Sequence, residues 1–334
     1  MTASFWAPGR VNLIGEHTDY SGGLVLPVAI HLGIGLTAQL ADRVALVSEG
    51  ERVDVAADGS GETDGWGRYA AAVAQELDAL GRPAVGVEGV IEADLPRGAG
   101  LGSSGALEVV VALAFCAAAD FELEPLELAL ACQRAERRAV GVPSGILDQA
   151  GSLLGRKGSA LLLDCGTLEH RWITLPERLA ILVIDSGERH THEGSGYGDR
   201  RRELEAGDQR RVRHVRTENE RVRAAVEALE RHDLQALGSL FAASHASLRD
   251  DYEVSTPTLD RLVEAALEAG ALGARLTGGG FGGSIVALAE RDGADAVLQR
   301  ILERSGTQGW VVRSADGAIR SSGDERRGRP EPPS

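Results

Sequence analysis

The sequence predicts an α+β or α/β protein, because strand-like and helical stretches alternate along its 334 residues. Hydrophobic residues make up 43% of the chain and charged residues 25%, which provides for an ample core and an ordinary soluble surface. The length suffices for two domains or one large one, since domains usually contain about 100–200 residues. No internal repeat interrupts this pattern.

The first half of the chain begins with strands and continues with helices. The strands are rich in β-branched residues and are bounded by glycine and charged turns, whereas the helices carry apolar residues at helical spacing. The expected elements are strands over 24–40 and 44–55, a helix over 66–80, a strand over 86–95, and helices over 106–119 and 125–139.

The second half contains two short buried strands, a long helical region and a strand after a glycine cluster. Pro257 is expected at the first turn of a helix, where its missing N–H costs nothing. The expected elements are strands over 161–164 and 179–185, a polar loop over 186–199, mostly helix over 200–271, a strand over 285–289, a helix over 294–304 and an edge strand over 310–313. The residues from 321 onward are rich in proline, glycine and charge and are expected to be disordered.

Composition excludes several function classes. The net charge of −15 disfavours nucleic-acid binding, and the arginine-rich stretch 200–223 is interleaved with glutamates, which favours a solvated helix face. No run approaches the roughly 18 apolar residues of a membrane span, and the first residues do not form a signal peptide, so we expect a cytoplasmic protein. Three cysteines without metal-type spacing predict neither a disulfide nor a zinc site.

The segment from Gly9 to Tyr20, GRVNLIGEHTDY, concentrates an arginine, two carboxylates, an imidazole and a phenol beside an apolar run. Carboxylates accept hydrogen bonds from hydroxyl groups, an imidazole donates or accepts, and arginine stabilises developing negative charge. These groups suit a polyhydroxylated ligand. The structural alternative is an N-terminal strand and turn with solvated charges.

A second segment, from Leu95 to Ala106, reads LPRGAGLGSSGA and lies between a predicted strand and a long helix. Its glycines let the backbone approach an anion, and the helix N-terminus that follows offers free N–H groups. The alternative is a flexible loop with a serine cap. A third segment, LTGGGFGGS from Leu276 to Ser284, is either a second backbone-exposing loop or a tight entry into a strand.

The three segments, in this order, resemble the motifs of the galactokinase family, within the GHMP group of small-molecule kinases that also covers homoserine, mevalonate and phosphomevalonate kinases. Residues 145–149, 157–165 and 244–255 extend the resemblance to about residues 5–315. It implies a two-domain α+β fold with an N-terminal mixed α/β domain, a C-terminal ferredoxin-like domain and the active site between them. We place the domains at 1–175 and 176–320, with a disordered tail at 321–334.

The resemblance further implies ATP-dependent phosphorylation of the C1 hydroxyl of D-galactose. Asp148 is then the catalytic carboxylate, and Arg10 keeps it ionised and stabilises the transferring phosphoryl group. Whether Asp148 removes the proton or orients the hydroxyl stays open. The implied sugar-binding residues are Glu16, His17, Asp19, Gly145 and Tyr197.

The same resemblance implies residues for ATP and Mg²⁺. The implied nucleotide-binding residues are Trp66, Tyr69, Gly98, Gly100, Gly102, Ser103 and Ser104. Ser104 and Glu136 match the magnesium positions and are the hard oxygen ligands that this ion prefers. Taken alone, Asp148 could be a helix cap, Glu136 an exposed helix charge, and the two aromatic residues part of the core.

The sequence departs from the family pattern in three places. It begins just before the first motif, without the N-terminal helix that many relatives carry. In the second motif, Gly102 and Gly105 replace a serine and an alanine. Residues 205–209 are also shorter than the matching region of many relatives. The alternatives are a kinase for N-acetylgalactosamine, L-arabinose or galacturonate, and a non-catalytic sugar and ATP sensor. We expect small-molecule partners only, no nucleic acid or membrane, and a monomer.

Overall fold

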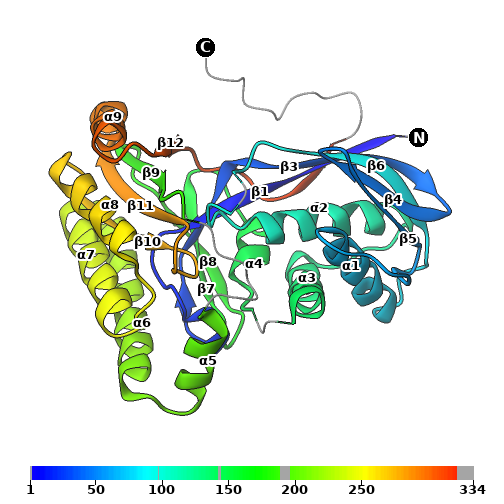
Figure 1. Cartoon of the computed structure of the whole chain (residues 1–334), viewed down its shortest axis with the longest axis horizontal. Coiled ribbons are helices and arrows are strands. Elements are labelled where there is room, and N and C mark those ends of the chain that lie inside the picture. The colour runs from blue at the N-terminus through cyan, green and yellow to red at the C-terminus, as the bar shows by residue number, and fades with distance from the viewer. Residues whose placement is uncertain (1, 97, 142–143, 189–195, 322–334) are drawn as a thin grey trace.

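The computed structural model describes residues 2–96, 98–141, 144–188 and 196–321 (Figure 1). Its N-terminal half is built on a six-stranded sheet with the order β13-β1-β3-β6-β4-β5. All neighbouring strands in it are antiparallel except the parallel pair β4 and β6. The strands are β1 (Ala3–Asn12), β3 (Pro27–Ala41), β4 (Arg43–Ser48), β5 (Glu51–Ala56), β6 (Gly86–Ala93) and β13 (Ile319–Ser321).

Helices cover one face of this sheet (Figure 1). They are α1 (Gly67–Ala79), α2 (Ser103–Ala118), α3 (Pro125–Val140) and the short α4 (Leu147–Leu153). Helix α2 packs directly on β1 and β3 and is itself surrounded by α1, α3 and α4. This central position explains why α2 is apolar on nearly all sides, since a helix enclosed by other elements has no face in contact with water.

The second half contains a four-stranded antiparallel sheet with the order β10-β11-β9-β12. Its strands are β9 (Leu179–Asp185), β10 (Gly273–Thr277), β11 (Ser284–Glu290) and β12 (Gln308–Val312). Alternate residues of β9 point to opposite faces. Leu182 and Ile184 pack with residues of α8 and α9, whereas Ile181 and Val183 join the core shared with the first half. Burial on both faces accounts for the unbroken apolar run of this strand.

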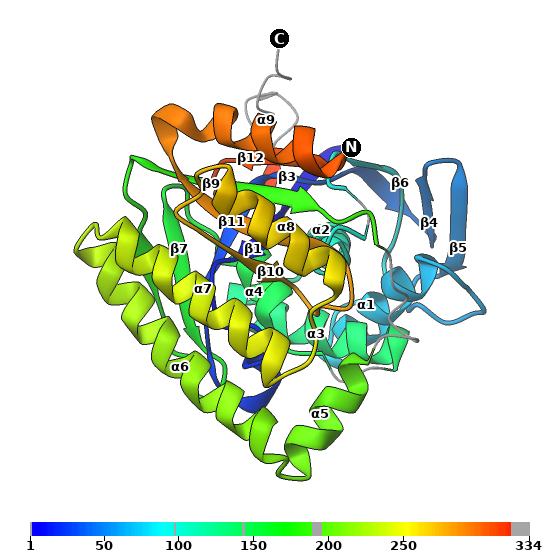
Figure 2. The ribbon, with the colours of Figure 1, turned by 60° about the vertical axis from the view of Figure 1, so that its left-hand side comes forward.

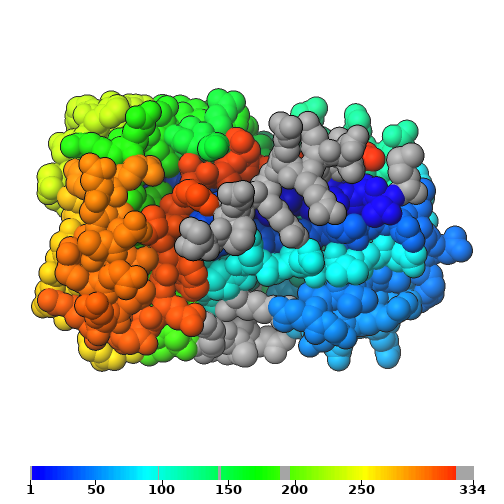
Figure 3. Space-filling view, turned by 90° about the horizontal axis from the view of Figure 1, so that it is seen from above, coloured from blue at the N-terminus to red at the C-terminus, as the bar shows by residue number. Residues whose placement is uncertain are grey.

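The helices of this half are α5 (Tyr197–Glu205), α6 (Gln209–Glu230), α7 (Leu234–Asp250), α8 (Pro257–Glu268) and α9 (Ala294–Ser305). Figure 2 shows α7 lying between α6 and α8. A small third sheet, β2-β7-β8, consists of β2 (Leu24–Val25), β7 (Ser159–Asp164) and β8 (His170–Thr174). Two short 3₁₀ helices are η1 (Asp19–Ser21) and η2 (Arg291–Gly293). The space-filling view places α9 and the β4–β5 hairpin at opposite ends of the molecule (Figure 3).

Several expected elements differ from the observed ones. The single strand expected over 44–55 is the hairpin of β4 and β5, which turns at Glu49 and Gly50, both with positive φ. Strands β1, β8, β10 and β13 and helix α4 were not predicted. The polar loop expected over 186–199 already contains the start of α5 at Tyr197. The edge position expected for the strand around Trp310 is confirmed by β12.

Two further observations bear on composition. Cys116 and Cys132 are buried free thiols, as their apolar helical context predicted. The described residues include no helix long and apolar enough to cross a membrane. The tail was expected to be disordered from 321 onward. Its first residue, Ser321, belongs to β13 and pairs with Ser4 of β1, and the rest of the tail lies outside the described residues.

Candidate active site

A cavity lies where the two glycine-rich loops meet the end of β1, the start of α4 and the start of α5. It is lined by Arg10, Glu16, His17, Asp19, Gly98, Gly100, Leu101, Gly102, Ser103, Ser104, Glu136, Val140, Ser144, Gly145, Leu147, Asp148, Tyr197, Thr277, Gly278, Gly279, Gly280, Gly282 and Gly283. The fold thus brings all three sequence motifs to one place. Concave sites with convergent polar groups are where ligands usually bind.

Arg10 and Asp148 form an ion pair inside this cavity. Asp148 lies in the first turn of α4, and its Oδ1 accepts hydrogen bonds from Arg10 Nε (2.8 Å) and Nη2. Arg10 Nη1 also donates to the carbonyl of Gly100 (2.6 Å), in the second motif. Burial disfavours the charge of Arg10, but Asp148 and Glu16 outweigh it and raise the arginine's pKa. Arg10 therefore joins the carboxylate to the glycine loop.

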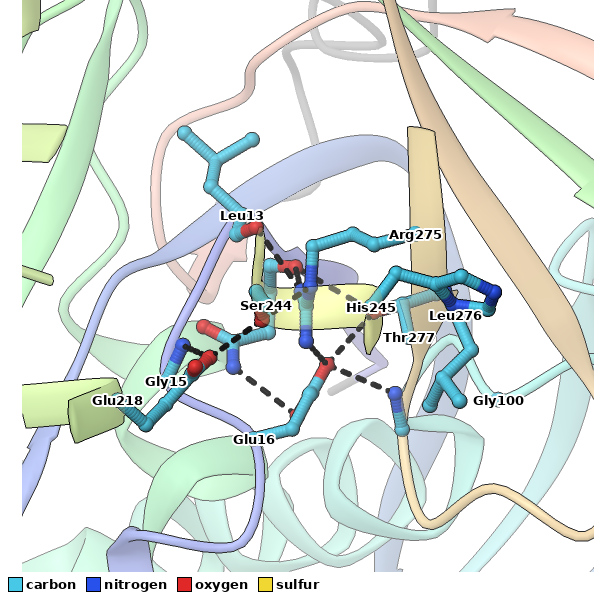
Figure 4. Close-up of polar contacts among 12 residues, drawn as sticks. Leu13, Gly15, Glu16, Gly100, Glu218, Ser244, His245, Arg275, Leu276 and Thr277 are labelled. Carbon is cyan, nitrogen blue, oxygen red and sulfur yellow. Dashed lines mark hydrogen bonds and ion pairs between the residues drawn. The ribbon is translucent and has the colours of Figure 1, made fainter. Parts of the chain in front are cut away.

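Glu16 lies at the junction between the first and third motifs and is almost fully buried. Its Oε1 accepts from Thr277 Oγ1 (3.0 Å) and from the backbone N–H of Gly278 (2.8 Å). Its Oε2 accepts from Asn12 Nδ2 (3.0 Å). These contacts, drawn in Figure 4, tie the end of β1, where the first motif begins, to the entry of the third motif.

His17 stands in an aromatic cluster. Its φ is +61°, an uncommon conformation for a residue with a side chain, and such strain concentrates at functional sites. Nδ1 lies 3.0 Å from Tyr20 Oη, which in turn lies 2.7 Å from Tyr252 Oη. The ring of Tyr197, predicted to complete the sugar pocket, packs 5.4 Å from that of His17. Burial, together with the neighbouring His214, lowers the pKa of His17 to about 3, so the imidazole is neutral.

Asp19 and Gly145 are in direct contact, although 126 positions separate them in the chain. A Cβ added to Gly145 would lie 1.7 Å from Asp19 Oδ2, so only glycine fits beside this carboxylate. Burial first, and then the charges of Asp148 and Glu16, raise the pKa of Asp19 to about 7. Asp148 and Glu16 are therefore close enough to Asp19 for their charges to repel its ionised form.

The N-terminus of α2 faces the same cavity. Its N-cap is Gly102, with φ +73°, and no side chain caps the first turn. The N–H groups of that turn, which have no intrahelical acceptor, and the positive end of the helix dipole are suited to an anion. Ser104 Oγ, in the first turn, donates to Glu136 Oε1 (2.9 Å) on α3. This pair of hard oxygen atoms fits Mg²⁺, which is usually held by one or two carboxylates together with substrate phosphates.

Two residues behind this pair were not predicted. Gln149 Nε2 donates both to Glu136 Oε2 (3.1 Å) and to Glu108 Oε2 (2.8 Å). Glu108 has no exposed surface, and burial together with the Glu136 charge raises its pKa well above the ordinary value. A glutamate at an inward position of an apolar helix was the available sequence signal, because such residues are almost never fully buried without a partner.

Trp66 and Tyr69, expected in an adenine pocket, are not among the residues that line this cavity. Trp66 is the N-cap residue of α1 and packs, partly buried, against the main hydrophobic core. The structure thus brings together the predicted sugar, phosphate and magnesium residues but not these two aromatic residues.

Comparison with known proteins identifies the family. Residues 3–39 match the galactokinase galactose-binding signature, residues 68–156 the GHMP kinase N-terminal domain and residues 225–307 the GHMP kinase C-terminal domain. A galactokinase of Streptomyces coelicolor is 38% identical, with 96% of this chain and 93% of that protein covered. A galactokinase of Chloroflexus aurantiacus is 39% identical over 92% of this chain and 88% of that one.

The fold agrees with these sequence matches. The crystal structure of Lactococcus lactis galactokinase complexed with galactose superimposes with a TM-score of 0.87 and 33% identity, covering 95% of each chain. Sequence signature, full-length identity and fold therefore coincide, and the chain belongs to the galactokinases of the GHMP kinase family.

Proposed function

We propose that the protein transfers the γ-phosphoryl group of ATP to the C1 hydroxyl of D-galactose, giving galactose 1-phosphate and ADP. The observation that carries this proposal is the cavity in which the galactose-binding signature meets both glycine loops and the Arg10–Asp148 pair. Phosphoryl transfer depends on positioning and charge stabilisation, and this cavity offers both.

In this proposal Asp148 accepts a hydrogen bond from the C1 hydroxyl. Arg10 favours the ionised carboxylate and orients it through its hydrogen bond to Oδ1. The same guanidinium stabilises negative charge on the transferring phosphoryl group. The proton leaves the hydroxyl either to Asp148 or to solvent, and a pH profile of the D148N variant distinguishes the two routes.

The sugar is held by side chains around the first motif. Asp19 and His17 supply polar contacts to ring hydroxyls, Tyr197 packs beside them, and Gly145 leaves the space that Asp19 occupies. Glu16 also lines the cavity and would offer its carboxylate to a sugar hydroxyl. Glucose differs from galactose only in the orientation of one hydroxyl group, so a site built from fixed hydrogen-bonding groups rejects it strongly.

The nucleotide phosphates bind at the glycine loops and the N-terminus of α2, with Gly98, Gly100, Gly102 and Ser103 at the phosphates. Ser104 and Glu136 would hold Mg²⁺, which supplies neutralisation of phosphate charge when it is bound. Trp66 and Tyr69 stay candidates for the adenine side.

The test is release of ADP from ATP and Mg²⁺ across galactose, 2-deoxygalactose, N-acetylgalactosamine, L-arabinose, galacturonate and glucose. Turnover on galactose and none on glucose is the expected result. Preference for another sugar of the panel would change the substrate and keep the mechanism. ATP binding without turnover on any sugar would contradict the proposal and favour a sensor. Light scattering on the same preparation tests the expected monomer.

A further inference from the structure

Arg275, on β10, is a fully buried cation directly behind the sugar side of the cavity. Its Nη1 donates to the carbonyls of Asn12 (3.1 Å) and Leu13 (2.9 Å), at the end of β1. Its Nη2 lies 3.5 Å from Glu16 Oε1. A buried charge is stable only where opposite charge and hydrogen bonds compensate it. Figure 4 shows the side chain reaching from the second sheet to the first motif.

The hydrogen bonds of Glu16 leave little freedom to its carboxylate. Each carboxylate oxygen accepts about two hydrogen bonds. Oε1 already accepts from Thr277 and Gly278 and faces Arg275, so its capacity is used. Among the described residues Oε2 accepts from Asn12 alone, which leaves it one acceptor site. Glu16 is therefore held at one oxygen and has capacity for a ligand hydroxyl at the other.

A second layer fixes Arg275 from behind. Arg275 Nε donates to Ser244 Oγ (3.1 Å), and that hydroxyl donates to Glu218 Oε1 (2.7 Å). Glu218 Oε1 also accepts from the backbone N–H of Gly15 (3.0 Å), the residue just before Glu16. Although burial by itself would raise the pKa of Glu218, the neighbouring His214, Arg275 and Arg221 lower it to about 2. The guanidinium thus stands between Glu16, within the first motif, and Glu218, which contacts the motif at Gly15.

We propose that Arg275 is a positioning residue of the sugar site, which holds the Glu16 carboxylate so that Oε2 keeps one acceptor position for a galactose hydroxyl. Arg275 is not itself one of the residues that line the cavity, and it acts through Glu16, which is. The same contacts tether the third glycine loop to the strand that carries Arg10. This inference rests on the proposed function, since it names how that function's sugar contact is fixed.

The experiment is a double-mutant cycle of Arg275→Met and Glu16→Gln, with KM for galactose, KM for ATP and kcat measured for each. Arg275→Met is expected to raise KM for galactose about 10-fold while KM for ATP changes by less than about 2-fold. In the Glu16→Gln background the same change should add less than about 2-fold, because the residue through which it acts is already altered. Multiplying effects in the double variant would overturn the proposal.

Two variants guard against a folding defect. Arg275→Lys keeps the charge and should restore most of the galactose KM relative to Arg275→Met. Ser244→Ala removes the hydroxyl between Arg275 and Glu218 and should raise KM for galactose about 3-fold. An unchanged galactose KM in Ser244→Ala, or no difference between Lys and Met at position 275, would overturn the proposal.

The control is Arg171→Met, which removes an exposed arginine paired with Glu230 on the surface and should leave every constant unchanged. Wild-type turnover separates the two levels of inference. If the wild type fails to phosphorylate galactose, the proposed function fails. If the wild type turns over and Arg275→Met does not differ from it, the positioning role alone fails.

Discussion

Asp148 is the only carboxylate of the cavity that accepts directly from an arginine also bound to a glycine loop, within the described residues. Asp148→Ala is expected to lower kcat by a factor of roughly 10²–10⁴, the usual contribution of a positioned acid or base. The substitution removes a half-buried side chain at a helix start, so the fold and nucleotide binding should persist. Coupled ADP release and ATP titration measure the two effects, and a kcat within about 2-fold of the wild type would refute the assignment.

Asp19 illustrates a residue whose function costs stability. Its pKa in the folded protein is about 7, against an ordinary value of 3.8, so the native state retains a proton that the unfolded chain releases between these values. Stability therefore falls as the pH rises through this window. Asp19→Asn should raise Tm at pH 8 by roughly 2–4 °C and leave it nearly unchanged at pH 4.

The same substitution should raise KM for galactose, because an amide replaces an acceptor that faces the sugar. Calorimetry at the two pH values and initial rates at pH 8 measure both effects. An equal Tm shift at pH 4 and pH 8 would show that the carboxylate's charge is not the cause. An unchanged KM would remove Asp19 from the sugar pocket.

The site residues that could be predicted from the sequence differ from those that could not in how far along the chain their partners lie. Asp19, Arg10 and Ser104 lie in short local patterns, and such patterns carry chemistry that a reader can interpret. Glu218 and Arg275 carry no local pattern, because their contacts with the first motif join segments more than 200 positions apart along the chain. A buried network of this kind becomes visible only once the fold has brought those segments together.

At the scale of elements, helices α2 and α4 approach closely because of a glycine. A Cβ at Gly105 would lie 2.7 Å from Asp148 Cβ and 3.1 Å from its carbonyl carbon. Gly105→Ala should therefore displace the start of α4, costing about 1–3 kcal/mol of overpacking against at most about 1 kcal/mol of helix propensity. We expect lower stability by chemical denaturation and a kcat reduced about 10-fold, since about 1 Å at a reacting group is worth 10²-fold.

Gly293→Ala is the matched control for this substitution. An added Cβ at Gly293 meets nothing within 4 Å, and this glycine lies outside the cavity. Stability should stay within about 0.5 kcal/mol of the wild type. If Gly105→Ala matches Gly293→Ala in both kcat and stability, α4 tolerates the added methyl group and the departure of this chain at position 105 has no bearing on Asp148.

The first turn of α4 also positions the proposed magnesium ligand, because Gln149 donates to Glu136. Gln149→Leu should raise the Mg²⁺ concentration for half-maximal activity about 10-fold, as is typical when a residue that orients a metal ligand is lost. Galactose KM should not change. Binding of Mn²⁺ to the ADP complex, followed by electron paramagnetic resonance, measures the same effect without turnover.

Gln75→Leu serves as the control, since among the described residues the Gln75 amide donates to the backbone carbonyl of Gly59, outside the cavity. Unaltered Mn²⁺ binding in Gln149→Leu would exclude a positioning role for the Gln149 amide.

The elements that could not be predicted from the sequence include α4 itself. Helix α4 has seven residues, which is too few for a helical period to appear in the sequence. Strand β1 was missed because polar residues of the first motif occupy its buried end, where a strand pattern would show apolar residues.

At the scale of the molecule, the first motif is held by both halves. The end of β1 contacts the second half through Arg275, and Gly15 contacts it through Glu218 on α6. The fold class and the meeting of the three motifs were predictable from the sequence, since the motifs resemble a known family. The three separate sheets were not, because strand pairing such as that of β1 with β13 joins the two ends of the chain.

Glu218 makes the stability of this arrangement dependent on acid. Its pKa is about 2 in the folded protein and 4.5 in an unperturbed side chain, so the unfolded chain binds its proton first as the pH falls. The stabilisation is therefore fully present above about pH 4.5 and is lost progressively toward pH 2. Glu218→Gln should destabilise the protein by roughly 3–5 kcal/mol at pH 7, since it leaves Arg221 without its buried counter-charge and Arg275 with Glu16 as its remaining partner.

The difference between the wild type and Glu218→Gln should shrink as the pH falls from 5 to 3, and denaturant unfolding at pH 7, 5 and 3 measures it. A surface glutamate provides the comparison: Glu230→Gln, which removes only an exposed pair with Arg171, should cost at most about 1 kcal/mol at each pH. A Glu218→Gln penalty that stays constant across this range would mean that shape, not charge, makes this residue necessary. A penalty that vanishes in acid would instead identify the charge of Glu218 as what keeps its contact with Gly15, and so the first motif, in place.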